Sequence, residues 1–179
     1  MNFEVKIDLV RKARYVVGGH LTDPPTTMTY STVVSRESVH IAFLLAALNN
    51  LKVLSGDIQN AYLNAPREEK LFFVADNEWG PDKGKSVVVV CALSGLKSSA
   101  LAWRNHLSDT LLANVLKFKS SLADPDIWYK GMVDEHGNGY YAYILIYVDD
   151  MLIIDKDPKS LMMQVKDEYN VWVRVRVRV

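Results

Sequence analysis

The spacing of apolar residues along the chain predicts three helices. The first is expected to begin after Ser35 as N-cap, with Glu37 in its first turn, and to end near residues 49–50. The second is expected from residue 98 or 99 to about 115, and the third from Pro158 to about residue 169. The apolar faces expected for the first two helices are Val39, Phe43, Leu44, Ala47 and Leu48, and Trp103, Leu107, Leu111 and Leu112.

Shorter apolar runs predict strands between and after these helices. We expect strands at residues 12–17, 52–58, 71–74, 86–92, 127–132, 140–148 and 151–154. Glycine-containing turns at residues 78–85 and 137–139 join two pairs of them as hairpins. Because the helices are scattered irregularly among hairpins, the pattern favours an α+β fold with helices on one face of an antiparallel sheet.

Composition sets limits on the class of protein. The 179 residues suggest one domain, with room for a small appendage, and 49% hydrophobic with 23% charged residues is ordinary for a globular chain. The single cysteine, Cys91, excludes an internal disulfide, fits a reducing intracellular compartment and is expected as a buried small side chain. The apolar runs are too short for a membrane helix. A net charge of zero argues mildly against a nucleic-acid binder, although a local basic groove can exist on a neutral protein.

Two acidic segments are candidates for a catalytic site. Asp149 and Asp150 lie between two apolar strands, so a hairpin places them at its tip. Adjacent carboxylates repel each other, and a divalent cation would offset that repulsion. The competing interpretation is a solvated polar turn. Asp57 ends another apolar strand, and a sheet that brought it beside this tip would supply three carboxylates for a hard cation such as Mg²⁺. The turn at Asp124-Pro125-Asp126 and the four scattered histidines show no catalytic pattern.

Four motifs in series carry a family resemblance. They are Lys12-Ala13-Arg14, the DIQNAYLN stretch from Asp57 to Asn64, Gly95-Leu96-Lys97, and the YVDD stretch from Tyr147 to Asp150. In this order and spacing the chain resembles the reverse transcriptases of copia-type LTR retrotransposons, over residues 10–169. The resemblance implies right-hand polymerase architecture, with residues 1–170 supplying the fingers and most of the palm. It further implies a truncated chain without thumb or RNase H, followed by an atypical valine-arginine tail at residues 171–179.

The resemblance also implies a two-metal site. Asp57, Asp149 and Asp150 would be the catalytic metal ligands, with the main-chain carbonyl of Ile58 as a further ligand. The expected cofactor is a pair of Mg²⁺ ions, with Mn²⁺ as an alternative. The implied reaction is attack of a primer 3′-hydroxyl on the α-phosphate of a deoxynucleoside triphosphate.

The same resemblance implies which residues contact the substrate. Tyr62 would exclude a ribose 2′-hydroxyl, although an ordinary core aromatic is an equal interpretation. The main-chain N–H groups near Asn60 and Ala61 could cradle the triphosphate. The remaining substrate-binding positions implied are Lys12, Arg14, Gly95, Lys97 and Tyr147.

Some of these assignments compete with simpler interpretations. Lys12 and Arg14 could form a solvated charged face of a strand. Ser94 stands where the family has an aromatic residue, and Ala100-Leu101 where it has a Pro-Arg pair, which weakens the expected template contact of that segment.

Three functional hypotheses follow. The first is an RNA-directed DNA polymerase module of a retrotransposon polyprotein, acting with an RNA or DNA template, a primer and the missing thumb and RNase H segments in a cytoplasmic particle. The second is a catalytically inactive remnant that at most binds nucleic acid or a partner. The third is an unrelated α+β domain with chance motif matches, for which Asp57 would lie far from Asp149.

Overall fold

The computed structural model describes residues 2–5, 7, 9, 11–14, 16–19, 28–169 and 171–177. The chain divides into two compact units, each made of two stretches of sequence. The first unit comprises Met1–Tyr30 and Tyr62–Trp103, and the second comprises Ser31–Ala61 and Arg104–Val179.

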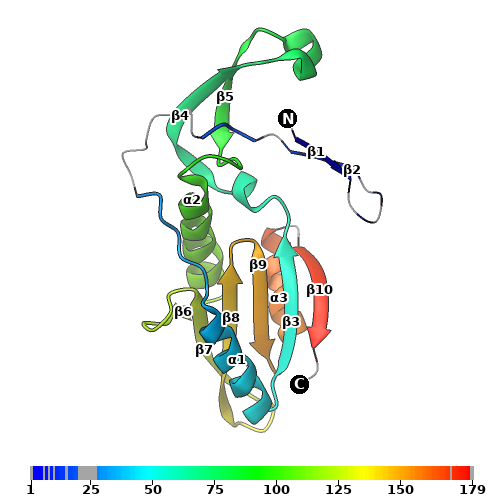
Figure 1. Ribbon diagram of the computed structural model, residues 1–179. Helices are drawn as coiled ribbons and strands as arrows, with labels where there is room; N and C mark the ends of the chain where they lie inside the picture. The colour runs from blue at the N-terminus through cyan, green and yellow to red at the C-terminus, as the bar shows by residue number, and fades with distance from the viewer. Residues whose placement is uncertain are drawn as a thin grey trace. The chain divides into compact units, whose positions relative to one another are not determined.

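A six-stranded antiparallel sheet forms the second unit, with the strand order β10-β3-β9-β8-β7-β6 (Figure 1). The strands are β3 Lys52–Ile58, β6 Lys119–Ser120, β7 Ile127–Val133, β8 Gly139–Tyr147, β9 Asp150–Asp155 and β10 Val171–Val177. The expected antiparallel sheet is therefore confirmed. The valine-arginine tail supplies the whole of the edge strand β10, which pairs with β3.

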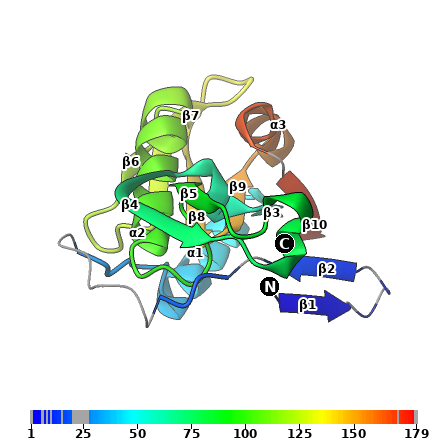
Figure 2. The same cartoon turned by 90° about the horizontal axis from the view of Figure 1, so that it is seen from above.

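Helices α1 (Arg36–Leu48) and α3 (Pro158–Glu168) lie on opposite faces of this sheet, so the prediction that helices cover one face was wrong (Figure 2). The apolar face expected for α1 was partly wrong as well, because Leu44 and Leu48 are 59% and 73% exposed. The buried positions are Ala42 and Ala46. Their small side chains allow α1 to approach the sheet closely, where its core includes Val53, Leu145 and Ile154.

Strand β3 presents alternate residues to the two helices. A Cβ built on Gly56 would lie 2.8 Å from Cε of Met162 in α3, so Gly56 faces that helix. Val53 packs on the α1 side instead. Alternation therefore places Asp57 on the same face as Val53. In Figure 1, α1 covers the end of the sheet that is remote from the β8–β9 turn.

The first unit contains two hairpins. Strands β1 (Asn2–Val5) and β2 (Arg11–Arg14) form one, and β4 (Pro66–Val74) and β5 (Ser86–Cys91) form the other. The short 3₁₀ helix η2 (Asn77–Asp82) lies in this unit, whereas the 3₁₀ helix η1 (Ala61–Asn64) begins at the last residue of the preceding stretch of the second unit. The observed β2 begins one residue earlier than the expected strand, and residues 16–18 are not in strand conformation. Cys91 is half-buried rather than fully buried.

The second expected helix is present as two consecutive segments. Helix α2 (Ser99–His106) is followed by the wider-turned η3 (Leu107–Val115). Trp103, Leu107 and Leu112 are each 1% exposed, as their apolar spacing predicted. Among the described residues, no helix is long and apolar enough to cross a membrane.

The N-terminus of α1 has the cap that the sequence predicted. The Ser38 N–H donates to Oγ of Ser35 at 3.1 Å. Asp124 adds a second acceptor, since its Oδ2 receives the Ser35 N–H at 3.0 Å and the Ser38 hydroxyl at 2.6 Å. Partial burial acts to raise the pKa of Asp124, but these hydrogen bonds together hold it below the ordinary value of 3.8.

The Asp124→Asn substitution should therefore lower stability in a pH-dependent way. A carboxyl with a lowered pKa stabilises the fold above its ordinary pKa, and this contribution is lost as the pH falls through the lowered value. We expect the variant to lose about 1 kcal/mol of unfolding free energy at neutral pH. Urea unfolding followed by circular dichroism should show the difference from the parent shrinking below pH 3.8. A difference that stays constant with pH would contradict the charge-dependent role.

Candidate functional site

The β8–β9 hairpin closes on a two-residue loop. Tyr147 pairs with Asp150, so Val148 and Asp149 form the turn and Asp150 is the first residue of β9. Val148 has a φ of 57°, a left-handed conformation that a β-branched side chain rarely adopts. Glycine is the usual residue at a turn position with positive φ. The strain at Val148 is therefore a feature that the rest of the fold must hold in place.

Asp57 lies directly beside this turn. The β3–β9 register pairs Asp57 with Asp150, and the Ile58 N–H donates to the Asp149 carbonyl at 2.8 Å. Residues directly opposite on antiparallel strands share a face, with their Cβ atoms about 4.5–5.5 Å apart. Asp57 and Asp150 are half-buried and Asp149 is exposed. The main chain thus brings together the three aspartates that were expected to meet, contrary to the third hypothesis.

The three aspartates fit a hard cation by their chemistry, because Mg²⁺ prefers carboxylate oxygens. Within the described part of the chain, however, no group of three or more His, Cys, Asp or Glu side chains is gathered as a potential metal site. The main chain places the three aspartates next to one another, but their side chains would have to rotate about χ1 for the carboxylates to converge on one ion. The register therefore supports the predicted ligand set, while the ligand geometry stays a prediction.

Other expected site residues of the second unit follow β3 or precede the turn. Asn60 is exposed with a φ of 51°, and Ala61 is 6% exposed. A positive φ at Asn60 suits the kind of turn in which successive N–H groups can point to one side. Tyr147 is 55% exposed at the end of β8.

The first unit holds the remaining expected residues. Lys12 and Arg14 pair with Glu4 and Asn2 in the register of the β1–β2 hairpin. Tyr62 is half-buried in η1, and Lys97 is exposed. Their roles toward a substrate are predictions from the family resemblance.

Gly95 has a structural reason to be glycine. Its φ is 96°, and a Cβ built on it would lie 2.1 Å from the carbonyl oxygen of Val17. Nearby, the Val17 N–H donates to the Ser94 carbonyl at 3.0 Å. The hydroxyl of Ser99 donates to the Leu93 carbonyl at 2.6 Å and accepts from the Leu93 N–H at 3.0 Å. The loop that carries Gly95 and Lys97 is thus fixed by close main-chain packing.

A pocket of about 430 Å³ lies elsewhere in the second unit. It is lined by Asn49 and by residues of β7 and β8 near the turn that joins them, including Tyr141 and Tyr143. None of the expected site residues lines it, so it adds nothing to the aspartate site.

The chain is similar to known proteins over nearly its whole length. The family described as reverse transcriptase (RNA-dependent DNA polymerase) matches residues 2–173. The chain is 28% identical to the retrovirus-related Pol polyprotein from transposon TNT 1-94 of Nicotiana tabacum, over 93% of this chain and 13% of that protein. It is 26% identical to the truncated transposon Ty1-A Gag-Pol polyprotein of Saccharomyces cerevisiae, over 94% of this chain and 14% of that protein. No solved structure gives a significant match.

The chain therefore belongs to the reverse transcriptase (RNA-dependent DNA polymerase) family. Within that family it is of the copia type, as its similarity to transposon polyproteins shows. A further example is the polyprotein from transposon RE1 of Arabidopsis thaliana, at 29% identity over 84% of this chain. The chain spans only 10–14% of the length of these relatives.

Proposed function

We propose that this chain carries the polymerase site of an RNA-directed DNA polymerase from a retrotransposon polyprotein, built as fingers and palm. It would extend a primer 3′-hydroxyl with deoxynucleotides on an RNA or DNA template. The single observation that carries the proposal is the β3–β9 register, which sets Asp57 opposite Asp150 and bonds Ile58 to Asp149. The other polyprotein segments, including thumb and RNase H, would be its partners.

The acidic residues would bind the metal ions. Asp57, Asp149, Asp150 and the Ile58 carbonyl would hold two Mg²⁺ or Mn²⁺ ions. When bound, these ions would activate the 3′-hydroxyl and stabilise the charge of the departing pyrophosphate. Carboxylates suit this task because they supply the oxygen ligands that Mg²⁺ prefers.

The substrate-binding residues would orient the triphosphate. The main-chain N–H groups of Asn60 and Ala61 would bind its oxygens, and Tyr62 would reject a ribose 2′-hydroxyl by steric clash. Lys12 and Arg14 would neutralise the β- and γ-phosphates. Gly95, Lys97 and Tyr147 would lie along the nucleotide and template.

The test is Mg²⁺-dependent extension of a DNA primer on an RNA template by the parent chain and by Asp149→Asn. This substitution keeps the side-chain shape and removes one metal-binding charge. We expect extension by the parent and a loss of at least about a hundredfold in the variant. Circular dichroism of both proteins is the control that the substitution leaves the fold intact.

No extension by a folded parent would contradict the proposal for this chain. It would favour the catalytically inactive remnant instead, in which the three aspartates are an inherited site that the chain alone cannot use.

A further inference from the structure

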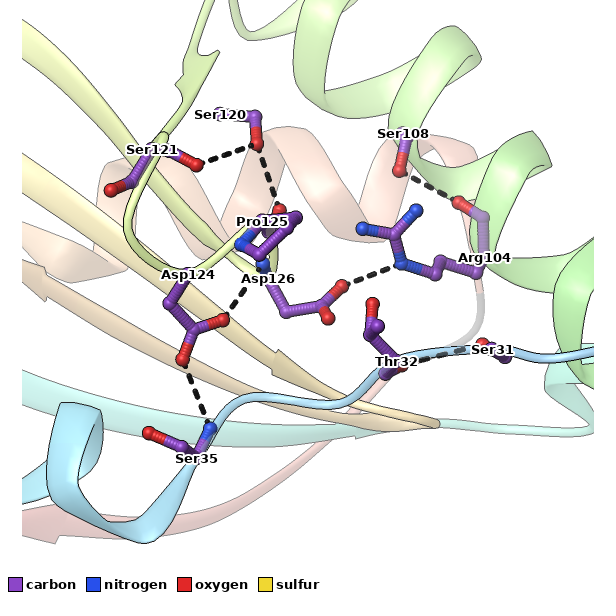
Figure 3. A network of polar contacts seen from close by, with 10 residues as sticks. All are labelled: Ser31, Thr32, Ser35, Arg104, Ser108, Ser120, Ser121, Asp124, Pro125 and Asp126. Carbon is purple, nitrogen blue, oxygen red and sulfur yellow. Dashed lines mark hydrogen bonds and ion pairs between the residues drawn. The ribbon is translucent and has the colours of Figure 1, made fainter.

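A network of polar contacts surrounds the turn at residues 124–126, which showed no catalytic pattern in the sequence (Figure 3). Nε of Arg104 donates to Oδ1 of Asp126 at 2.7 Å. The Asp126 side chain is 2% exposed and that of Arg104 is 22% exposed. A buried carboxylate without a partner costs folding free energy, so Asp126 needs this ion pair to stay buried.

The main chain of Asp126 reaches the strand that leads to the aspartate turn. Its carbonyl accepts the Ile146 N–H at 3.0 Å, which extends the β7–β8 ladder by one residue. The Ile146 carbonyl in turn accepts the Val34 N–H at 3.1 Å. Both hydrogen-bonding groups of Ile146 are thus held from outside the β8–β9 hairpin, one residue before Tyr147.

The turn at residues 124–126 is held by two further hydrogen bonds. Oδ1 of Asp124 accepts the Asp126 N–H at 3.1 Å, and the Ser120 hydroxyl donates to the Pro125 carbonyl at 2.9 Å. Oδ2 of Asp124 binds the N-terminus of α1, as described above. These hydrogen bonds hold the Asp126 carbonyl in place, and the ion pair with Arg104 connects Asp126 to α2.

Such a support matters at this place because Val148 holds a strained conformation two residues beyond Ile146. On the other side of the loop, the bond from Ile58 to Asp149 holds the turn to β3. If the hydrogen bonds at Ile146 were lost, the Val148-Asp149 turn would relax, and Asp149 would move with it.

We propose that Arg104 and Asp126 are positioning residues for the aspartate turn. Through the Asp126 carbonyl and Ile146, their ion pair fixes the main chain that carries Asp149. This inference rests on the proposed function of the three aspartates. Neither residue touches the metal or the substrate in it, and both act through β8.

Oδ2 of Asp126 has no hydrogen-bond partner among the described residues, and neither does the buried Oγ1 of Thr32. Figure 3 draws the Thr32 side chain beside this ion pair. Without a second hydrogen bond to Oδ2, Arg104 is the cation that offsets the Asp126 charge. The anchoring of Asp126 therefore depends on Arg104 more than a fully hydrogen-bonded carboxylate would.

The test compares Asp126→Ala and the conservative Asp126→Asn with the parent. In either variant the partly exposed Arg104 can turn to water, so no buried charge is left unpaired. The matched control is Lys85→Met, which breaks an exposed ion pair of Lys85 with Asp82, 2.6 Å long. The first measurement is amide hydrogen exchange by NMR at Ile146, with Leu54 and Ile153 in the middle of the sheet as references.

In Asp126→Ala we expect exchange at Ile146 to rise about tenfold, with a smaller rise in Asp126→Asn and none in Lys85→Met. Exchange at Leu54 and Ile153 should stay within about twofold of the parent. Unchanged exchange at Ile146, or an equal rise across the whole sheet, would overturn the proposal.

The second measurement follows Mn²⁺ binding by electron paramagnetic resonance, with primer extension beside it. We expect Asp126→Ala to weaken Mn²⁺ affinity about tenfold, as loss of an outer support of metal ligands does. The kcat of extension should fall at least about tenfold while KM for the nucleotide changes by less than about twofold. If the parent neither binds Mn²⁺ nor extends a primer, the proposed function fails, and the exchange result alone decides whether Asp126 holds Ile146 in place.

Discussion

Replacing Asp57 with asparagine is expected to reduce RNA-templated primer extension by at least about a hundredfold while leaving the fold intact. Asp57 is half-buried at the end of β3 and opposite Asp150 in the register. Asparagine has nearly the same shape, so the strand pairing should persist. What is lost is one negative charge among three carboxylates that would share the metal ions.

A matched control separates loss of this charge from loss of any surface charge. Asp167→Asn removes an exposed carboxylate on α3 and should leave extension unchanged. The double variant Asp57→Asn with Asp149→Asn should be little worse than either single variant, because residues that act as a unit have non-additive effects. Extension by Asp57→Asn at the rate of the Asp167→Asn control would show that Asp57 is no metal ligand.

The second large effect is expected on stability, from Gly95→Ala. Alanine at a φ of 96° is strained, and its Cβ would lie 2.1 Å from the Val17 carbonyl oxygen and 2.9 Å from Cγ1 of Val16. The first of these is a main-chain atom, which cannot move aside as the tip of a side chain can. We expect the unfolding free energy to fall by about 3 kcal/mol.

Gly84→Ala is the control for this prediction. Gly84 also has a positive φ, 82°, but nothing lies within 4 Å of a Cβ built there. It should therefore show only the backbone penalty of about 1 kcal/mol. Urea unfolding of the three proteins measures both costs. Equal losses in the two variants would mean that the close approach of Gly95 to Val17 does not limit the fold.

The sequence anticipated the elements whose physics is local. Ser35 was recognisable as an N-cap because serine accepts the free N–H groups of a helix start, and it does so here. The strand from Lys52 to Ile58 was found with the same bounds, because the segment carries Val53, Leu54 and Ile58 and is bounded by polar, turn-forming residues. The buried Trp103, Leu107 and Leu112 followed from helical spacing.

Local patterns were less able to fix which face of α1 packs inward. Leu44 and Leu48 looked like core residues, yet the helix buries Ala42 and Ala46 against the sheet. Apolar character alone favoured the larger side chains, whereas the space between α1 and the sheet suits the smaller ones. The distance between helix and sheet is a tertiary quantity that no single segment encodes.

The sequence by itself determined the family and singled out the three aspartates as candidate site residues, because motifs in series record which residue types the chain carries at which spacing. Only the tertiary structure decided that Asp57 lies opposite Asp150, since strand register depends on pairing between segments far apart in the chain. It also decided that Arg104 pairs with Asp126, 22 residues away in sequence. An ion pair between a helix and a turn leaves no periodic trace in the sequence, so only the tertiary structure brings its two charges together.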